Sequence, residues 1–190
     1  MAWNLISLSE APAAPWRNGG GVTRELAVRP TREDWAWRIS VADVTADGPF
    51  SHFPGVQRWF AVVRGEGVRL AVDGEVHEVL GTSAPLQFDG AAQVDSWLLA
   101  GPTQDLNLMV HRERASGVMT RLAAERRFTT AAEGVVAVFA LGAPASVRRH
   151  GNDSLVEVPP YSLAWAALPA ATALEIATSG ALCMEITSRR

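Results

Sequence analysis

The sequence predicts an all-β protein made of two β-barrel-like halves packed against each other. The 16 Gly and 11 Pro residues interrupt the chain at short intervals, and short runs rich in Val, Leu, Ile, Trp and Phe lie between them. Short apolar runs bounded by turn residues are typical of β-sandwiches and β-barrels. Residues 65–67 (GEG) and the Asp73-Gly74 dipeptide separate three such runs in succession, which predicts a meander with a tight hairpin turn.

The expected strands follow one another along most of the chain. In order they cover residues 22–29, 35–44, 59–64, 68–72, 75–80, 93–100, 105–111, 134–141, 155–158, 162–167, 173–177 and 181–187. One segment, residues 116–126, has a weak helical spacing of apolar residues, and a loop with one helical turn fits it equally well.

Composition divides the chain into two parts. Residues 1–112 carry most of the Trp and Asn and the polar motifs, whereas residues 113–190 repeat the short-strand pattern with more Ala. The later strands occupy a segment too short to be stable alone, so we expect one compact unit of two halves.

Charge and composition exclude several classes of function. The net charge is −3 with a pI near 5.8, which does not favour nucleic acid as a partner. All 17 basic residues are Arg, so lysine Schiff bases, phosphate-loop lysines and lysine general bases are excluded. Cys183 has no partner for a disulfide. The chain shows neither a signal-peptide pattern nor an apolar run of ~18 residues, so we expect a cytoplasmic protein that does not engage a membrane.

Catalytic and metal motifs are missing from the local sequence. His52, His77, His111 and His150 form no closely spaced pair, so no spacing supports a metal site. The Gly-x-Ser-x-Gly motif is absent, and Cys183 lies in an apolar run that predicts a buried, unreactive thiol. We therefore assign no catalytic residue, no metal ligand and no cofactor.

Strand alternation places a few polar groups on one face of each early strand. Thr23 and Glu25 share a face, as do Arg38 and Ser40, and on a third strand Asp105, Asn107 and Met109 do so. Such faces either contact water or line a pocket inside a barrel. In a pocket, Arg38 would need Glu25 or an anionic ligand as its partner. The preceding glycine run, 19–21, is either a structural turn or a close approach to a ligand.

Four segments resemble the HutD/Ves family in order and spacing. They are residues 15–26 (PWRNGGGVTREL), 37–42 (WRISVA), 48–58 (GPFSHFPGVQR) and the pair 101–102 (GP) with 105–109 (DLNLM). The resemblance implies a cupin-superfamily bicupin, two packed halves of the RmlC-like jelly-roll type. Metal-binding cupins carry paired histidines where this chain has His52 alone, so the resemblance implies a metal-free pocket.

The resemblance also implies a non-catalytic regulator of histidine utilisation that binds a formylated or carboxylate intermediate, a small organic acid. Arg38 would clamp the ligand carboxylate, and Glu25 would orient Arg38 or accept a ligand N–H. Gln57 stands where family members commonly have an acid, which leaves the direction of Arg58 open. The expected ligand-binding residues are Trp16, Asn18, Gly20, Thr23, Glu25, Arg38, Ser40, Phe50, Phe53, Arg58, Asn107 and Met109.

Two other functions stay open at this point. One is a cupin enzyme acting on a small carboxylate or an imidazole-derived acid, with Glu25 as the general acid/base. The other is a stress-related protein-interaction module, since one branch of the family is described as stress-induced. Sheet edges also leave a homodimer open.

Overall fold

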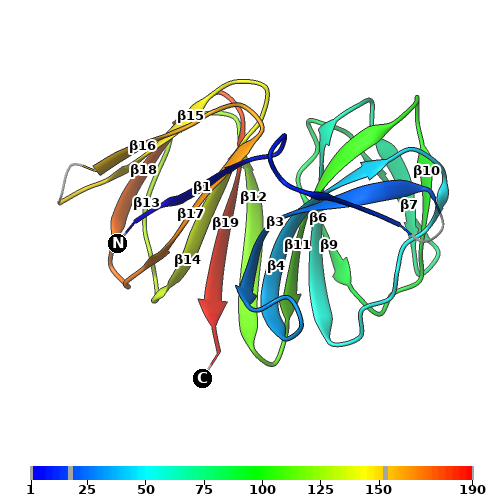
Figure 1. The fold of residues 1–190 in the computed structure, drawn as a ribbon, viewed down its shortest axis with the longest axis horizontal. Coiled ribbons are helices and arrows are strands. Elements are labelled where there is room, and N and C mark those ends of the chain that lie inside the picture. The colour runs from blue at the N-terminus through cyan, green and yellow to red at the C-terminus, as the bar shows by residue number, and fades with distance from the viewer. Residues whose placement is uncertain (1, 17–18, 152–153, 190) are drawn as a thin grey trace. The chain divides into compact units, whose positions relative to one another are not determined.

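The computed structural model describes residues 2–16, 19–151 and 154–189. All the secondary-structure elements in these ranges are β-strands. The predicted all-β class is therefore confirmed (Figure 1). The chain divides into a central unit, residues 11–115, and a terminal unit made of residues 1–10 and 116–190. No helix in the described ranges is long and apolar enough to cross a membrane.

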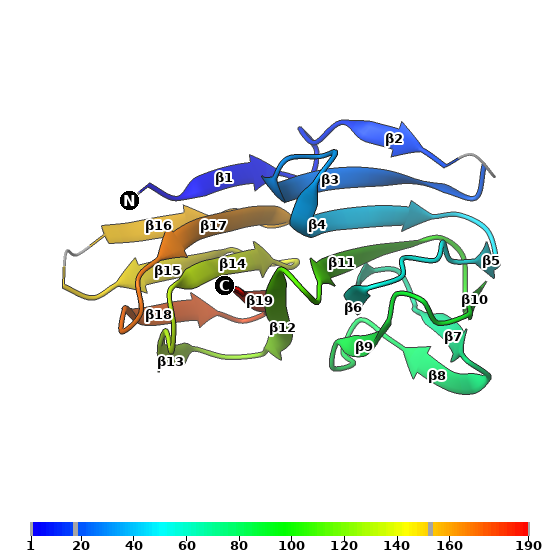
Figure 2. The same cartoon turned by 90° about the horizontal axis from the view of Figure 1, so that it is seen from below.

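The central unit consists of two sheets. The larger has the strand order β2 (Ala13–Pro15), β3 (Gly21–Pro30), β4 (Trp35–Val44), β11 (Thr103–His111), β6 (Val56–Arg64) and β9 (Leu86–Asp89). The smaller has the order β5 (Gly48–Pro49), β10 (Val94–Leu98), β7 (Val68–Val72) and β8 (Glu75–Val79), as Figure 2 shows from below. Apolar side chains from both sheets form one core, including Phe60, Leu70 and Val94.

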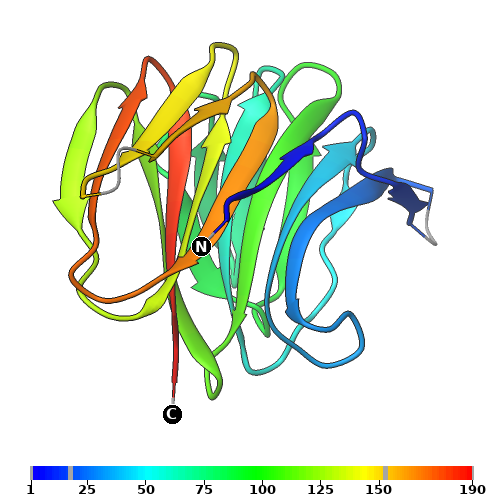
Figure 3. The ribbon, with the colours of Figure 1, turned by 60° about the vertical axis from the view of Figure 1, so that its left-hand side comes forward.

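The terminal unit repeats this plan. One sheet has the order β1 (Asn4–Ser7), β17 (Ser162–Leu168), β14 (Gly134–Ala140), β19 (Ala181–Ser188) and β12 (Ala115–Leu122). The other has the order β13 (Arg126–Thr129), β18 (Ala173–Thr178), β15 (Ala145–Arg149) and β16 (Ser154–Val158). In Figure 3 the N-terminal strand β1 runs beside β17, with which it pairs from Asn4 to Ser7. The division at residue 112 placed residues 1–10 in the other half, but this pairing makes them part of the terminal unit.

The two units share one topology. The strand order β9-β6-β11-β4 of the central unit corresponds to β17-β14-β19-β12, and β5-β10-β7-β8 corresponds to β13-β18-β15-β16. Every strand number differs from its counterpart by the same step of eight, so the chain contains the same supersecondary unit twice. Each unit is a pair of sheets sharing a core, which fits the β-barrel-like halves that the sequence predicted, although the sheets do not close into a barrel.

Two local predictions have opposite outcomes. The hairpin turn at Asp73-Gly74 is confirmed: both residues have positive φ, 48° and 87°, and Val72 pairs directly with Glu75. The prediction of a helix or a loop with one helical turn at residues 116–126 is wrong, because this segment forms most of β12 and enters β13. Ala115, Gly117 and Met119 alternate as buried residues along β12, and pairing with β19 outweighs the weak helical spacing.

Candidate functional site

A cavity of about 470 Å³ lies within the central unit, on the inner face of its larger sheet. Strands β2, β3, β4, β6 and β11 contribute to its wall, and residues 49–53 contribute the remaining side. Its lining residues are Pro15, Trp16, Thr23, Arg38, Ser40, Ala42, Val44, Pro49, Phe50, Ser51, Phe53, Arg58, Phe60, Asp105, Asn107 and Met109. Nine of the residues expected at the site are among them, and Asn18 lies outside the described residues.

Strand register explains why these residues meet. Met109 is paired with Arg38 on one side and with Arg58 on the other. Asn107 is paired in the same way with Ser40 and Phe60. Directly opposed residues of antiparallel strands project from the same face, so each row places three side chains together. The polar faces that alternation found on β4 and β11 therefore line a pocket rather than the water-facing side of the sheet.

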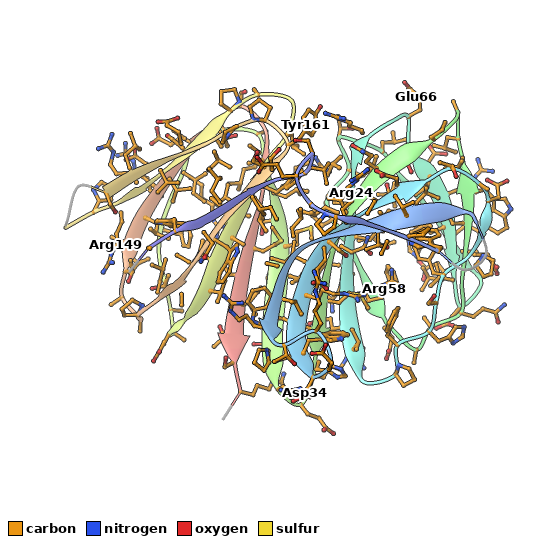
Figure 4. All side chains as sticks on the ribbon, in the orientation of Figure 1. Arg24, Asp34, Arg58, Glu66, Arg149 and Tyr161 are labelled. Atoms are coloured by element: carbon orange, nitrogen blue, oxygen red, sulfur yellow. The ribbon has the colours of Figure 1, made fainter. Side chains whose placement is uncertain are left out.

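Arg58 points into this interior, where Figure 4 labels it. Only 7% of the residue is exposed. Its Nη2 donates a hydrogen bond of 3.0 Å to Oδ1 of Asn107, and its Nη1 donates one of 3.4 Å to the carbonyl of Ser51. Its Nε is buried without a hydrogen-bond partner. The question that Gln57 raised is thus settled, because Arg58 lines the cavity.

Aromatic rings surround both cavity guanidiniums. The guanidinium carbon of Arg58 lies 5.0 Å from the ring centre of Phe88, 5.1 Å from that of Phe50 and 5.8 Å from that of Phe53. The guanidinium carbon of Arg38 lies 5.8 Å from the same Phe53 ring. Cation–π attraction stabilises a charge in such a place while leaving its donors free for a ligand.

The two cavity arginines have no counter-charge beside them. In the part of the chain that the structure describes, neither Arg38 nor Arg58 lies within ion-pair distance of a carboxylate. Burial, followed by the charge of Arg38, lowers the pKa of Arg58 to about 10. Burial also lowers the pKa of Arg38, an effect that the charge of Glu25 opposes. Two nearby unpaired cations in a partly apolar cavity make a strong attraction for an anion.

Two expected residues do not line the cavity. Glu25 is paired with Ser40 across the sheet, but its carboxylate accepts a 2.7 Å hydrogen bond from Nε of Arg32. It acts on Arg38 through its charge and not by contact with the cavity. The carbonyl of Gly20 accepts a hydrogen bond of 3.0 Å from the backbone N–H of Thr45, which continues the pairing of β3 with β4 beyond Gly21 and Val44.

The entrance to β3 explains the glycine run. A Cβ on Gly21 would collide with the carbonyl of Asp43 and press on the Trp16 ring. Glycine therefore lets the chain pass close enough for Trp16 to reach the cavity, where its indole N–H donates a 2.7 Å hydrogen bond to Thr23. At Gly21 the glycine run therefore has a structural role, and the close approach there is to Asp43 and Trp16.

Asp105 lines the cavity, although the sequence analysis did not select it as a ligand-binding residue. The residue is 0% exposed; its Oδ2 accepts a 3.0 Å hydrogen bond from Thr103, and its Oδ1 has no partner. Burial raises the pKa of this carboxyl to about 7; the Thr103 hydrogen bond lowers it and the charge of Asp43 raises it further. The signal was present, because alternation puts Asp105 on the face of Asn107 and Met109.

The residues present do not fit a metal centre of the kind that metal-binding cupins hold. No group of three or more His, Cys, Asp or Glu side chains gathers to hold a metal ion anywhere in residues 2–16, 19–151 or 154–189. The cavity instead presents two guanidiniums, which repel a cation.

The corresponding interior of the terminal unit is apolar. Strands β14 and β19 take the places of β6 and β11 there. Their inward positions are Val136, Val138, Ala140, Ala181 and Cys183, which all belong to one hydrophobic core. The same topology therefore packs a core in one unit and holds a polar cavity in the other.

Comparison with known proteins gives the chain its relatives. A family model described as HutD matches residues 8–184. An uncharacterised 21.2 kDa protein in the hutC 3′ region of Pseudomonas putida is 34% identical over 152 residues, which cover 78% of this chain and 79% of that protein. Protein Ves of Citrobacter koseri is 35% identical over 127 residues, covering 66% of this chain and 65% of that protein.

Solved structures agree with these relatives. HutD from Pseudomonas fluorescens SBW25, in a structure described as a formate condition, has a TM-score of 0.86 and 30% identity, with both chains covered completely. A mutant of Bacillus subtilis oxalate decarboxylase has a TM-score of 0.63 at 9% identity over 96% of this chain and 76% of that one, a likeness of fold alone. The resemblance to HutD and Ves is confirmed, and the chain belongs to the HutD family.

Proposed function

We propose that this protein is a non-catalytic regulator of histidine utilisation that binds a small organic acid, a formylated or carboxylate intermediate of the pathway. The ligand occupies the cavity of the central unit, with its carboxylate between Arg38 and Arg58 and no metal ion. The observation that carries the proposal is the pair of guanidiniums in the cavity wall, Arg58 buried and Arg38 half-buried, with no carboxylate of the described residues within ion-pair distance of either.

The size and lining of the cavity support a ligand of this class. Small-molecule pockets commonly measure about 300–1,000 Å³ and combine apolar walls with a few convergent polar groups. Here Phe50, Phe53 and Phe60 supply apolar surface, and Ser40 and Thr23 supply neutral polar groups. Guanidinium donors match a carboxylate in charge and in planar geometry.

Relatives support the pathway assignment. The family carries the name HutD, and one relative is described by its position in a hutC 3′ region. The Pseudomonas fluorescens HutD structure is described as a formate condition, and formate is the simplest carboxylate. We extend the role around histidine utilisation to this chain on that basis.

The test is a binding measurement with pathway acids. Urocanate, formiminoglutamate, N-formylglutamate, formate and glutamate are each added while the melting temperature is recorded, and calorimetry follows any that shift it. A ligand at ~100 times its Kd stabilises the fold by about 2.7 kcal/mol, or roughly 5–10 °C for a chain of this size. Arg38→Gln should weaken binding at least ~10-fold, because hydrogen bonds between charged groups contribute about 1.5–3 kcal/mol.

A matched control separates the cavity from the general charge of the protein. Arg32 is exposed and bonds Glu25 outside the cavity, so Arg32→Gln removes the same charge and should bind like the wild type. No shift with any of the five acids would overturn the proposal. Equal losses of affinity in Arg38→Gln and Arg32→Gln would show that the ligand does not bind in the cavity.

One observation favours a second function, an enzyme acting on a small acid. Asp105 places a carboxyl with a pKa of about 7 in the cavity wall, a value suited to general acid/base work near neutral pH. Glu25 is unsuited to this role because Arg32 holds it outside the lining. Conversion of any of the five acids, abolished in Asp105→Asn, would favour the enzyme over the regulator.

A further inference from the structure

The inner wall of the cavity contains one carboxyl group that binding an acid must affect. Asp105 is fully buried, between Ala42 of β4 and Val62 of β6, the residues with which it pairs. Asn107 follows two residues later on the same face and accepts the hydrogen bond of Arg58. Asp105 and Arg58 line the same cavity, so an anion held there adds negative charge within electrostatic reach of Asp105.

We infer that the cavity takes up one proton together with its acid ligand, and that Asp105 is the residue that holds this proton. The inference rests on the proposed function, because it requires an anion at the arginine pair. It makes Asp105 a residue that determines specificity: with Asp105 neutral the cavity presents two positive charges to a ligand, and with Asp105 ionised it presents a net charge of one.

The surroundings of Asp105 give the direction of the coupling. Asp43 of β4, whose carboxylate is held by Arg24 at 3.2 Å, raises the pKa of Asp105 by its charge. Arg38 of β4 and Arg58 of β6 line the same cavity, and Arg64 of β6 is exposed. On its own strand Thr103 donates to Oδ2, and Oδ1 lacks a partner.

The facing strands supply no further charge. The buried residues of β7 and β10 are Val68, Leu70, Val94 and Ser96, all uncharged. A carboxylate bound in the same cavity therefore adds negative charge near Asp105, which stabilises its protonated form.

Neutral pH is the range in which this coupling operates. The pKa of Asp105 is about 7, so both of its forms are populated in the ligand-free protein. Ligand carboxylates keep their charge between pH 6.5 and 8.5 because their ordinary pKa lies near 4. Arg58, with a pKa of about 10, stays mostly charged over the same range. Where binding takes up a whole proton, each unit of rising pH weakens binding by ~10-fold. Because less than one proton is taken up over much of the range, we expect a total loss of affinity of about tenfold between pH 6.5 and 8.5.

The experiment is calorimetry with N-formylglutamate and with sodium formate at pH 6.5, 7.5 and 8.5. Two buffers of different ionisation enthalpy are used at each pH, so that the number of protons taken up is measured directly. The wild type should take up about 0.6 of a proton near pH 7.5, because part of Asp105 is already protonated there, and should bind about tenfold more weakly at pH 8.5 than at 6.5. Asp105→Asn should take up none and bind with nearly constant affinity.

Controls assign the proton to Asp105. Asp95→Asn removes a carboxyl from β10 outside the cavity lining and should behave like the wild type. The four histidines remain in Asp105→Asn, so its residual pH dependence measures their share. Should that variant not fold, Thr103→Val removes the donor to Oδ2 and should move the midpoint of the pH dependence upward, because that hydrogen bond lowers the pKa.

The outcomes separate the two proposals. Wild-type binding without proton uptake, an unchanged pH slope in Asp105→Asn, or an unmoved midpoint in Thr103→Val would overturn the proton coupling and leave the proposed function standing. Failure of the wild type to bind either probe at every pH would overturn the coupling, and failure with all five acids would overturn the proposed function.

Discussion

Asp105→Asn should stabilise the protein relative to the wild type increasingly as the pH rises. The Asp105 carboxyl has a pKa of about 7 in the folded protein, raised by burial from an ordinary value of 3.8. Below pH 3.8 it is protonated in both states and its ionisation contributes nothing. Between 3.8 and about 7 only the unfolded chain loses the proton, which favours unfolding; above about 7 the penalty is complete and constant.

The size of the effect follows from the pKa difference. One pKa unit corresponds to 1.36 kcal/mol, so a shift of about three units destabilises the wild type by roughly 4 kcal/mol at alkaline pH. About 2.5 kcal/mol of this develops between pH 5 and pH 8. The Asn amide does not titrate, and burying its NH₂ group costs about 1–3 kcal/mol at every pH. The difference between pH 5 and pH 8 is therefore free of that constant cost.

Urea denaturation at pH 5, 6.5 and 8 measures this difference through tryptophan fluorescence. Five of the seven tryptophans belong to residues 11–115, so the signal reports mainly the unit that contains Asp105. The free energy of unfolding of Asp105→Asn minus that of the wild type should increase by about 2.5 kcal/mol from pH 5 to pH 8. Asp95→Asn should show no such trend. A constant difference for Asp105→Asn would refute the raised pKa and the reasoning built on it.

Three further variants or treatments test other parts of the structure. Glu25→Gln should bind the acid ligand within about twofold of the wild type by calorimetry, since Arg32 holds that carboxylate outside the cavity, and a tenfold loss would place Glu25 in the site. Cys183 should resist a thiol reagent at pH 8 until urea unfolds the terminal unit, because burial raises its pKa to about 12, and fast labelling of the native protein would contradict this. Gly65→Ala should lower the free energy of unfolding in urea by at least ~2 kcal/mol, which is more than Gly74→Ala should. Both glycines have positive φ, but of the two only Gly65 would bring a Cβ to 2.6 Å from a carbonyl oxygen, that of Pro102. Equal losses of stability in the two variants would contradict this collision.

The cavity wall could be predicted from local sequence because the period of a strand is two. Once residues 35–44 and 105–111 are recognised as strands, Arg38 and Ser40 must share a face, and so must Asn107 and Met109. The structure adds what no single strand contains, namely that β11 lies between β4 and β6 and joins the polar faces into one wall. Which neighbour a strand takes is decided by the whole chain.

The failures have tertiary causes. Glu25 has the expected alternation, but Arg32 captures its side chain seven residues later, after the strand has turned back. Strand β12 lacks a strong strand pattern and takes its conformation from pairing with β19. Asp105 had the right alternation, but its complete burial and its hydrogen bond from Thr103 depend on tertiary packing, which a single strand does not reveal.

The internal duplication shows that the fold does not require the polar cavity. In the terminal unit the strands that correspond to β6 and β11 close the interior with Val136, Val138 and Cys183, and no charge is buried among them. In the central unit Arg58 and Asp105 occupy the corresponding strands at a cost in desolvation, which the shifts of their pKa values reflect. Interiors that differ this much also explain why the corresponding strands of the two units carry different residues. Since an apolar interior satisfies the same topology, the fold does not require the polar residues of the central unit, and this supports the binding role proposed for its cavity.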